Sequence, residues 1–198
     1  MANRVTGSTD TSGALSVVPR AVKSVLVIGK ATNPIDPIDA GKIFSIGGTS
    51  DVKAKFGDNS KLTKAVRILI TNGVDNIKGI VVANPTEAET DADLYDAALN
   101  ASLSDKSIKC VLLDTNDTTV IIKLKEHLGI AEDEDLFRYS SVAPSPTNVT
   151  QDALVTFAAS IDSDRIFVPG PAFLDGSNGE LVDSVLAAAG IISLLMTE

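Results

Sequence analysis

The chain has 198 residues, a net charge of −9 at neutral pH and a pI near 4.6. An acidic protein repels phosphate backbones, and no dense cluster of Lys and Arg offsets this repulsion locally, so nucleic acid is not an expected partner. A single cysteine and a single histidine exclude an internal disulfide and most metal or acid–base constellations.

Residues 1–24 are expected to form a flexible or strand-donating N-terminal arm. They are rich in Ser, Thr and Gly, include Pro19 and show no helical period, a composition that cannot offset the entropy of its own ordering. The start of the chain has no apolar core of signal-peptide length. We therefore expect the protein to be made in the cytoplasm and to leave it only as part of a particle.

Residues 25–198 are expected to form a single domain in which short apolar runs alternate with amphipathic helices. Strands are predicted at residues 25–28, 43–46, 77–83, 110–113, 139–142 and 165–168. Helices are predicted at residues 51–56, 61–71, 94–101, 120–128, 154–161 and 178–196. Continuous apolar strands between helices predict an α/β fold, with a largely parallel or mixed sheet flanked by helices.

Polar residues mark where several helices should begin. Thr49 or Ser50 can cap the helix at 51–56, and Asn59 or Ser60 can cap the next one. Asp117 is well placed to cap the helix that follows it.

The single histidine and the single cysteine are both expected to be structural. His127 lies in the last turn before Gly129, and we expect it on the surface at the end of a helix. The acidic run at 131–135 is interpreted as a solvated loop. Cys110 lies within an apolar run and is expected to be a buried thiol.

Two segments resemble catalytic loops only in part. Gly47 and Gly48 follow a strand, but they lack the spacing of a dinucleotide or P-loop fingerprint. The run from Cys110 to Asp114 resembles the nucleophile loop of phosphatases of the haloacid dehalogenase type. Those enzymes place their two carboxylates two residues apart, whereas Asp114 and Asp117 are three apart. We expect no catalytic centre here.

A calcium site could be drawn in the polar loop at 175–180, but its residues do not have the ligand spacing of an EF-hand. Ser177 or Asn178 as a helix cap is the simpler interpretation. The chain is therefore not expected to be an enzyme, and the sequence assigns no catalytic, cofactor-binding or metal-binding residue.

Several short segments follow one another along the chain in a recognisable order. The first, Ile43-Phe-Ser-Ile-Gly-Gly-Thr-Ser-Asp-Val-Lys-Ala-Lys-Phe56-Gly57, combines a strand, a short helix and Phe-Gly. After it come Ser60-Lys61-Leu62, Asn72-Gly73, 77–82, 160–169, Asp175-Gly176 and the Ala-rich run 187–190. This order of segments resembles that of contractile tail sheath proteins from phages and R-type bacteriocins.

This resemblance implies a structural subunit that polymerises helically around an inner tube and contracts to drive the tube through a target envelope. It implies the inner tube and the baseplate or terminator as partners, and a location in the virion tail of a bacteriophage or in a tail-like injection particle. No cofactor and no membrane insertion are implied. Sheath subunits usually continue beyond the Ala-rich helix, so we expect either a fragment or a reduced member.

Two alternatives remain open at this point. A small cytosolic α/β enzyme or ligand-binding domain would bind its ligand at the carboxyl ends of the strands, near Gly29, Gly47, Asp114 and Pro169. A ring-forming accessory with the sheath fold, such as a terminator or baseplate component, is the other alternative.

Overall fold

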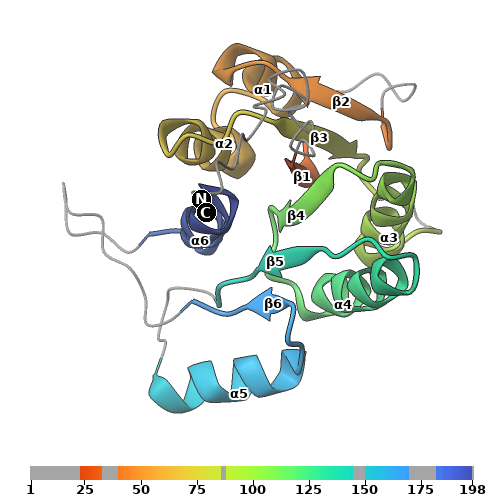
Figure 1. Ribbon diagram of the computed structural model, residues 1–198, viewed down its shortest axis with the longest axis vertical. Helices are drawn as coiled ribbons and strands as arrows, with labels where there is room; N and C mark the ends of the chain where they lie inside the picture. The colour runs from red at the N-terminus through yellow and green to blue at the C-terminus, as the bar shows by residue number, and fades with distance from the viewer. Residues whose placement is uncertain (1–22, 33–39, 86–87, 145–149, 170–181, 198) are drawn as a thin grey trace, which may run out of the picture.

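The computed structural model describes residues 23–32, 40–85, 88–144, 150–169 and 182–197. These residues form one mixed sheet of six strands with helices on both faces (Figure 1). The strand order is β2-β3-β1-β4-β5-β6, and every neighbouring pair is parallel except β2 with β3. The α/β prediction with a mixed sheet is confirmed.

The strands fall close to their predicted places because β-branched and apolar runs fit a sheet that is buried on both faces. Their bounds are β1 Ser24–Lys30, β2 Ile43–Ile46, β3 Ile77–Val82, β4 Ile108–Leu113, β5 Tyr139–Ser141 and β6 Ile166–Phe167. The five parallel strands are β1, β3, β4, β5 and β6. If they are numbered 1 to 5 in chain order, their order across the sheet is 2-1-3-4-5, which is common in doubly wound sheets.

Six α-helices and one 3-10 turn lie between or after the described strands. Their bounds are α1 Thr49–Phe56, α2 Lys61–Thr71, α3 Asp91–Ala101, the 3-10 helix η2 Ser102–Ser104, α4 Thr118–Asp133, α5 Gln151–Ile161 and α6 Ser184–Thr197. Within the described ranges, no helix is both long and apolar enough to cross a bilayer.

The core has two layers, one on each face of the sheet. On one face α1, α2 and α6 cover β1 and β4, and α6 supplies buried Val185, Ala188, Ala189 and Ile192. On the other face α3 and α4 cover the same strands (Figure 1). Alternate β1 residues, such as Val27 and Leu26, therefore face opposite layers. Each fully buried aliphatic side chain of this kind contributes about 1.5–3 kcal/mol.

Three predictions about helix starts have different outcomes. Ser60 caps α2, where its hydroxyl accepts a hydrogen bond from the Thr63 amide at 3.0 Å. Asp117 caps α4 through the Thr119 amide. The prediction that Thr49 or Ser50 caps α1 is wrong, because α1 includes both residues and Gly48 occupies the cap position without a side-chain bond.

Two helix bounds also differ from their predictions. α4 does not end at Gly129 but continues to Asp133, because Ala131 packs in the interior. The acidic run at 131–135 is therefore largely helical and not a loop. α6 begins at Ser184, and the polar loop at 175–180, where Ser177 or Asn178 is expected to cap the helix, lies outside the described residues.

Candidate functional site

The carboxyl ends of β1 and β4 form the first candidate site. In the sheet, β3 lies on one side of β1 and β4 lies on the other. Doubly wound sheets bind ligands at the carboxyl ends of two such strands, where the strand order reverses. Asp114 follows β4 directly, and the amide of Lys30 in β1 donates to its Oδ2 at 2.8 Å. The Tyr95 hydroxyl of α3 donates to Asp114 Oδ1, so both carboxylate oxygens have internal donors.

The space at the carboxyl ends of β1 and β4 is filled by side chains of the protein itself. A Cβ atom on Gly29 would lie 2.3 Å from Asp114 Cγ and 2.5 Å from Leu62 Cδ1, so even one methyl group does not fit there. Lys30 Nζ reaches Asp91 Oδ2 at 2.7 Å and closes the cluster on the α3 side. Gly29 is therefore explained by close packing against the half-buried Asp114 carboxylate, and needs no ligand.

The electrostatics of the two aspartates differ. Burial raises the pKa of Asp114, and the hydrogen bonds from Tyr95 and Lys30 oppose that shift. Asp117 is exposed, and the hydrogen bond from Thr119 lowers its pKa. Because each carboxylate is engaged by its own neighbours, the structure does not direct the two at a common substrate or metal.

Other residues considered from the sequence also have structural roles. Burial raises the pKa of the Cys110 thiol to about 12, so the thiolate is scarce at neutral pH, and the predicted buried thiol is confirmed. The Gly47 amide donates to Asp51 Oδ2 at 2.8 Å, which closes the turn before α1. Among the described residues, no three His, Cys, Asp or Glu gather to hold a metal ion.

The surface position predicted for His127 is wrong. Its side chain is buried, and its Nε2 lies 2.9 Å from Nη1 of Arg138, which is fully buried at the start of β5. Since an arginine can only donate, His127 Nε2 is the acceptor and the ring proton lies on Nδ1. Burial and the nearby guanidinium lower the pKa of His127 to about 4, so the ring is neutral at neutral pH.

Arg138 holds together three segments of the chain. Its Nη1 donates to the Ser102 hydroxyl at 2.8 Å, and its Nη2 donates to the carbonyls of Ser102 and Asp105 at 2.9 and 3.0 Å. The sequence did not single out Arg138, since it lies between two aromatic residues in a segment that reads as an ordinary strand. This polar cluster joins η2 and α4 to β5 and has no opening to solvent at the arginine.

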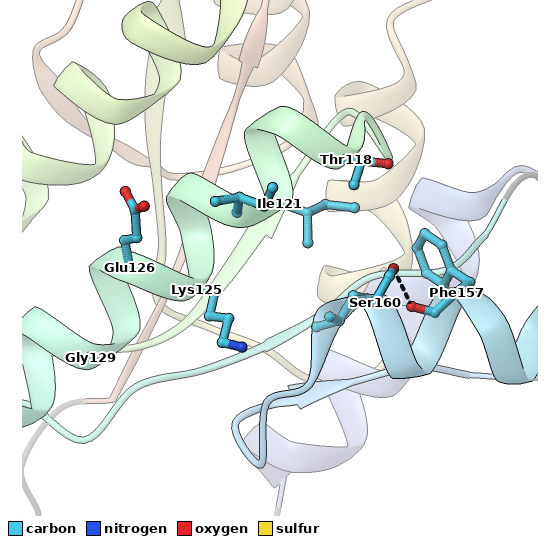
Figure 2. A pocket seen from close by; sticks show the side chains of 9 residues that line it. Thr118, Ile121, Lys125, Glu126, Gly129, Phe157 and Ser160 are labelled. Carbon is cyan, nitrogen blue, oxygen red and sulfur yellow. Dashed lines mark hydrogen bonds between the residues drawn. The ribbon is translucent and has the colours of Figure 1, made fainter.

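A groove between α4 and α5 is the first open surface. Figure 2 shows Ile121 and Lys125 of α4 facing Phe157 and Ser160 of α5 across a cavity of about 430 Å³. The dashed line marks the Ser160 hydroxyl bonded to the Phe157 carbonyl within α5. The lining side chains include one cation, Lys125, and one acid, Glu126, and carry no catalytic constellation.

The second open surface is at the end of the sheet, over β5 and β6. Phe137, Tyr139 and Phe167 are 50%, 40% and 40% exposed there. A cavity of about 410 Å³ adjoins them, and its other lining residues are Lys23, Lys109, Cys110, Leu195 and Met196. We call these eight residues the aromatic patch. It is the most hydrophobic open surface described here, and the sequence analysis did not identify it.

Comparison with known proteins gives a class of fold. No family model matches the chain, and no curated protein matches its sequence. Among solved structures, the helical sheath of the anti-feeding prophage in its contracted state aligns over 96% of this chain at 18% identity, with a TM-score of 0.59. The baseplate structure of the same prophage aligns over 90% at 16% identity, with a TM-score of 0.55.

The sheath tail protein of Desulfitobacterium hafniense aligns over 90% of the chain at 10% identity, with a TM-score of 0.62. The chain therefore has a contractile-tail sheath-like fold. It spans about half the length of these neighbours, covering 53%, 48% and 60% of them respectively. The neighbours are structural proteins of tail-like assemblies, and the resemblance seen in the segment order is confirmed at the level of fold.

Proposed function

We propose that this chain is a structural subunit of a contractile phage-tail-type sheath and is not an enzyme. The observation that carries the proposal is the alignment of 96% of the chain with a contracted helical sheath. In this role the subunits polymerise helically around an inner tube and contract to drive it through a target envelope. Residues 1–24 would act as the arm and residues 25–198 as the body, assembled into a virion tail or tail-like particle.

The geometry of the sheet supports a role without chemistry. In a doubly wound enzyme the space at the carboxyl ends of β1 and β4 would be open for substrate. Here Asp114 occupies it and is engaged by Lys30 and Tyr95. Contraction of a helical polymer needs only rigid bodies that exchange one set of contacts for another.

A ring-forming accessory is the second candidate, favoured by the alignment with the prophage baseplate. A subunit of either type would contact its own copies, the inner tube and baseplate or terminator proteins. The two roles differ in closure: a heterologous contact that does not close gives a helical tube, whereas one that closes gives a ring.

Negative-stain electron microscopy of the purified chain, alone and mixed with its cognate inner-tube protein, distinguishes the possibilities. A sheath subunit gives tubes or tube-bound striations, and a baseplate or terminator component gives rings. Particles that stay dispersed under both conditions would contradict the proposal. Such a result would favour the alternative of a small ligand-binding domain.

A further inference from the structure

The aromatic patch has the composition of an interface core. The chain contains six Phe and two Tyr, and Phe137, Tyr139 and Phe167 are three of them. The rings of Tyr139 and Phe167 lie 6.2 Å apart, so they form one continuous apolar surface. Exposed aromatic groups that cluster in this way are typical of the centres of protein–protein contacts.

The strand register explains why these rings share one face. Ser141 pairs with Phe167, and Tyr139 lies two residues before Ser141, so Tyr139 and Phe167 point to the same side of the sheet. Ile166 points to the opposite side, into the core beneath α4. The C-terminal turn of α6, with Leu195 and Met196, borders the rings.

The charge of the patch is opposite to that of the chain. Lys23 and Lys109 supply the only charged side chains among the described residues that line its cavity. The Arg165 guanidinium lies over the Phe137 ring, 5.3 Å from its centroid, and is paired with Glu132 of α4 in the same chain, so the two lysines carry the free charge of the patch. A cationic apolar surface on a protein of net charge −9 is complementary to a surface that is apolar and acidic.

The C-terminal end of α4 has that chemistry. Ile130 is 44% exposed, and the exposed acidic residues Asp133 and Glu134 follow it within one turn. Carboxylates at the negative end of a helix dipole are unfavourable unless cations lie nearby. Two other described acids, by contrast, are already paired within the chain: Asp91 with Lys30, and Asp105 with Lys78.

We propose that the aromatic patch of one subunit binds the acidic C-terminal end of α4 in a second copy of this chain. Ile130 would contact the exposed rings, and Asp133 and Glu134 would face Lys23 and Lys109. The two surfaces consist of different residues. A contact made once per pair of copies runs head to tail and extends a polymer, whereas the same contact made twice about a twofold axis closes a dimer. The inference rests on the proposed function, since it names one contact through which subunits associate.

A charge exchange tests the contact directly. One variant carries Lys23→Glu with Lys109→Glu, and the other carries Asp133→Lys with Glu134→Lys. Each variant alone brings like charges together, and we expect sedimentation velocity to show self-association weakened at least about tenfold. An equimolar mixture restores opposite charges at every contact, so association should return to the parent level.

A second pair of variants tests the apolar part of the contact. Phe137→Ser should weaken self-association by about tenfold or more, because it removes a central aromatic group. Val155→Ser on α5, where Val155 is 60% exposed outside the patch, should leave association unchanged. Thermal melts of all variants at low concentration show whether the monomer fold is intact.

Each remaining result contradicts the proposal in a recognisable way. Polymers that form equally well from every variant would overturn this contact and leave the proposed function standing. Failure of the charge-exchanged mixture to associate would show that the two surfaces do not meet. A large loss of melting temperature in monomeric Phe137→Ser, with association unchanged, would show that a segment of the same chain covers the patch.

Discussion

The central strands of the sheet and the two strands at its β6 end are built differently. β1, β3 and β4 lie at the centre, and their residues, such as Val27 and Leu112, are fully buried between helices on both faces. β5 and β6 have only three and two residues, and their Tyr139 and Phe167 remain 40% exposed. The centre therefore supplies most of the buried core, whereas the end of the sheet carries the exposed aromatic patch.

The two regions also satisfy polar groups in different ways. At the centre, Asp114 is a half-buried acceptor that takes hydrogen bonds from Lys30 and Tyr95. At the junction with β5, Arg138 is a buried donor that serves backbone carbonyls and His127. The arginine adds to the other links between β5 and the larger core, which are the pairing with β4 and the hydrogen bond from the Ser140 hydroxyl to the Val111 carbonyl. Variants of this junction should therefore have the largest effects.

Arg138→Met is expected to be the most destabilising change, by about 3–5 kcal/mol, because it leaves buried carbonyls and His127 without their donor. Arg67→Met, at an exposed position of α2, is the matched control and should change stability by less than about 0.5 kcal/mol. Urea denaturation measures both. Equal unfolding midpoints for the two variants would show that the end strands do not depend on this cluster.

The same junction should make the protein sensitive to acid. The pKa of His127 is about 4 in the folded state, below its ordinary value of 6.5, so the unfolded chain binds a proton more readily between these values. The stabilisation from neutral His127 is then complete above pH 6.5 and is lost as the pH falls toward 4, by up to about 3 kcal/mol.

The measurement is the free energy of unfolding from pH 4 to pH 7, compared between the parent chain and His127→Gln. Other groups titrate in the same range, so the test is the difference between the two curves. That difference should change with pH mainly between 4 and 6.5. Parallel curves would mean that His127 is solvated in the folded protein.

The central half of the fold was predictable from the sequence because its hydrophobic pattern agrees with its burial. The apolar run at 25–28 is a buried strand, and Ser60 caps α2 as its hydroxyl chemistry suggests. The segment order also identified the sheath-like fold, which the structural neighbours confirm. Patterns of this kind report packing directly.

The end of the sheet was not predictable from the sequence, because its apolar side chains are exposed and its charged side chain is buried. In the segment 137–139 the aromatic residues point outward and Arg138 points inward. A pattern-based interpretation places the polar side chain on the surface, and only the tertiary arrangement of η2 and α4 shows that it has buried acceptors. Gly129 misled in a similar way, since the burial of Ala131 outweighs the tendency of glycine to end a helix.

The helix α6 has both a buried and a partly exposed face, so the two can be compared within one helix. Ala188 is buried against the sheet, and Ala188→Leu should overpack this contact and cost about 1–3 kcal/mol. Ala187→Leu makes the same chemical change next to it, at a partly exposed position, and should cost clearly less. Thermal unfolding of the two variants gives the comparison. Equal melting temperatures would place α6 at the periphery of the core.

Gly190 lies two residues beyond Ala188 in the same helix and should show the smallest effect, in the opposite direction. A Cβ atom built on Gly190 meets nothing within 4 Å, so the monomer has no steric need for glycine there. Gly190→Ala should therefore stabilise the isolated subunit by about 0.4–1 kcal/mol, since alanine loses less backbone entropy on forming a helix. Thermal unfolding at low concentration measures this gain. A loss of stability instead would mean that the α6 backbone lies closer to a neighbouring segment than the described residues show.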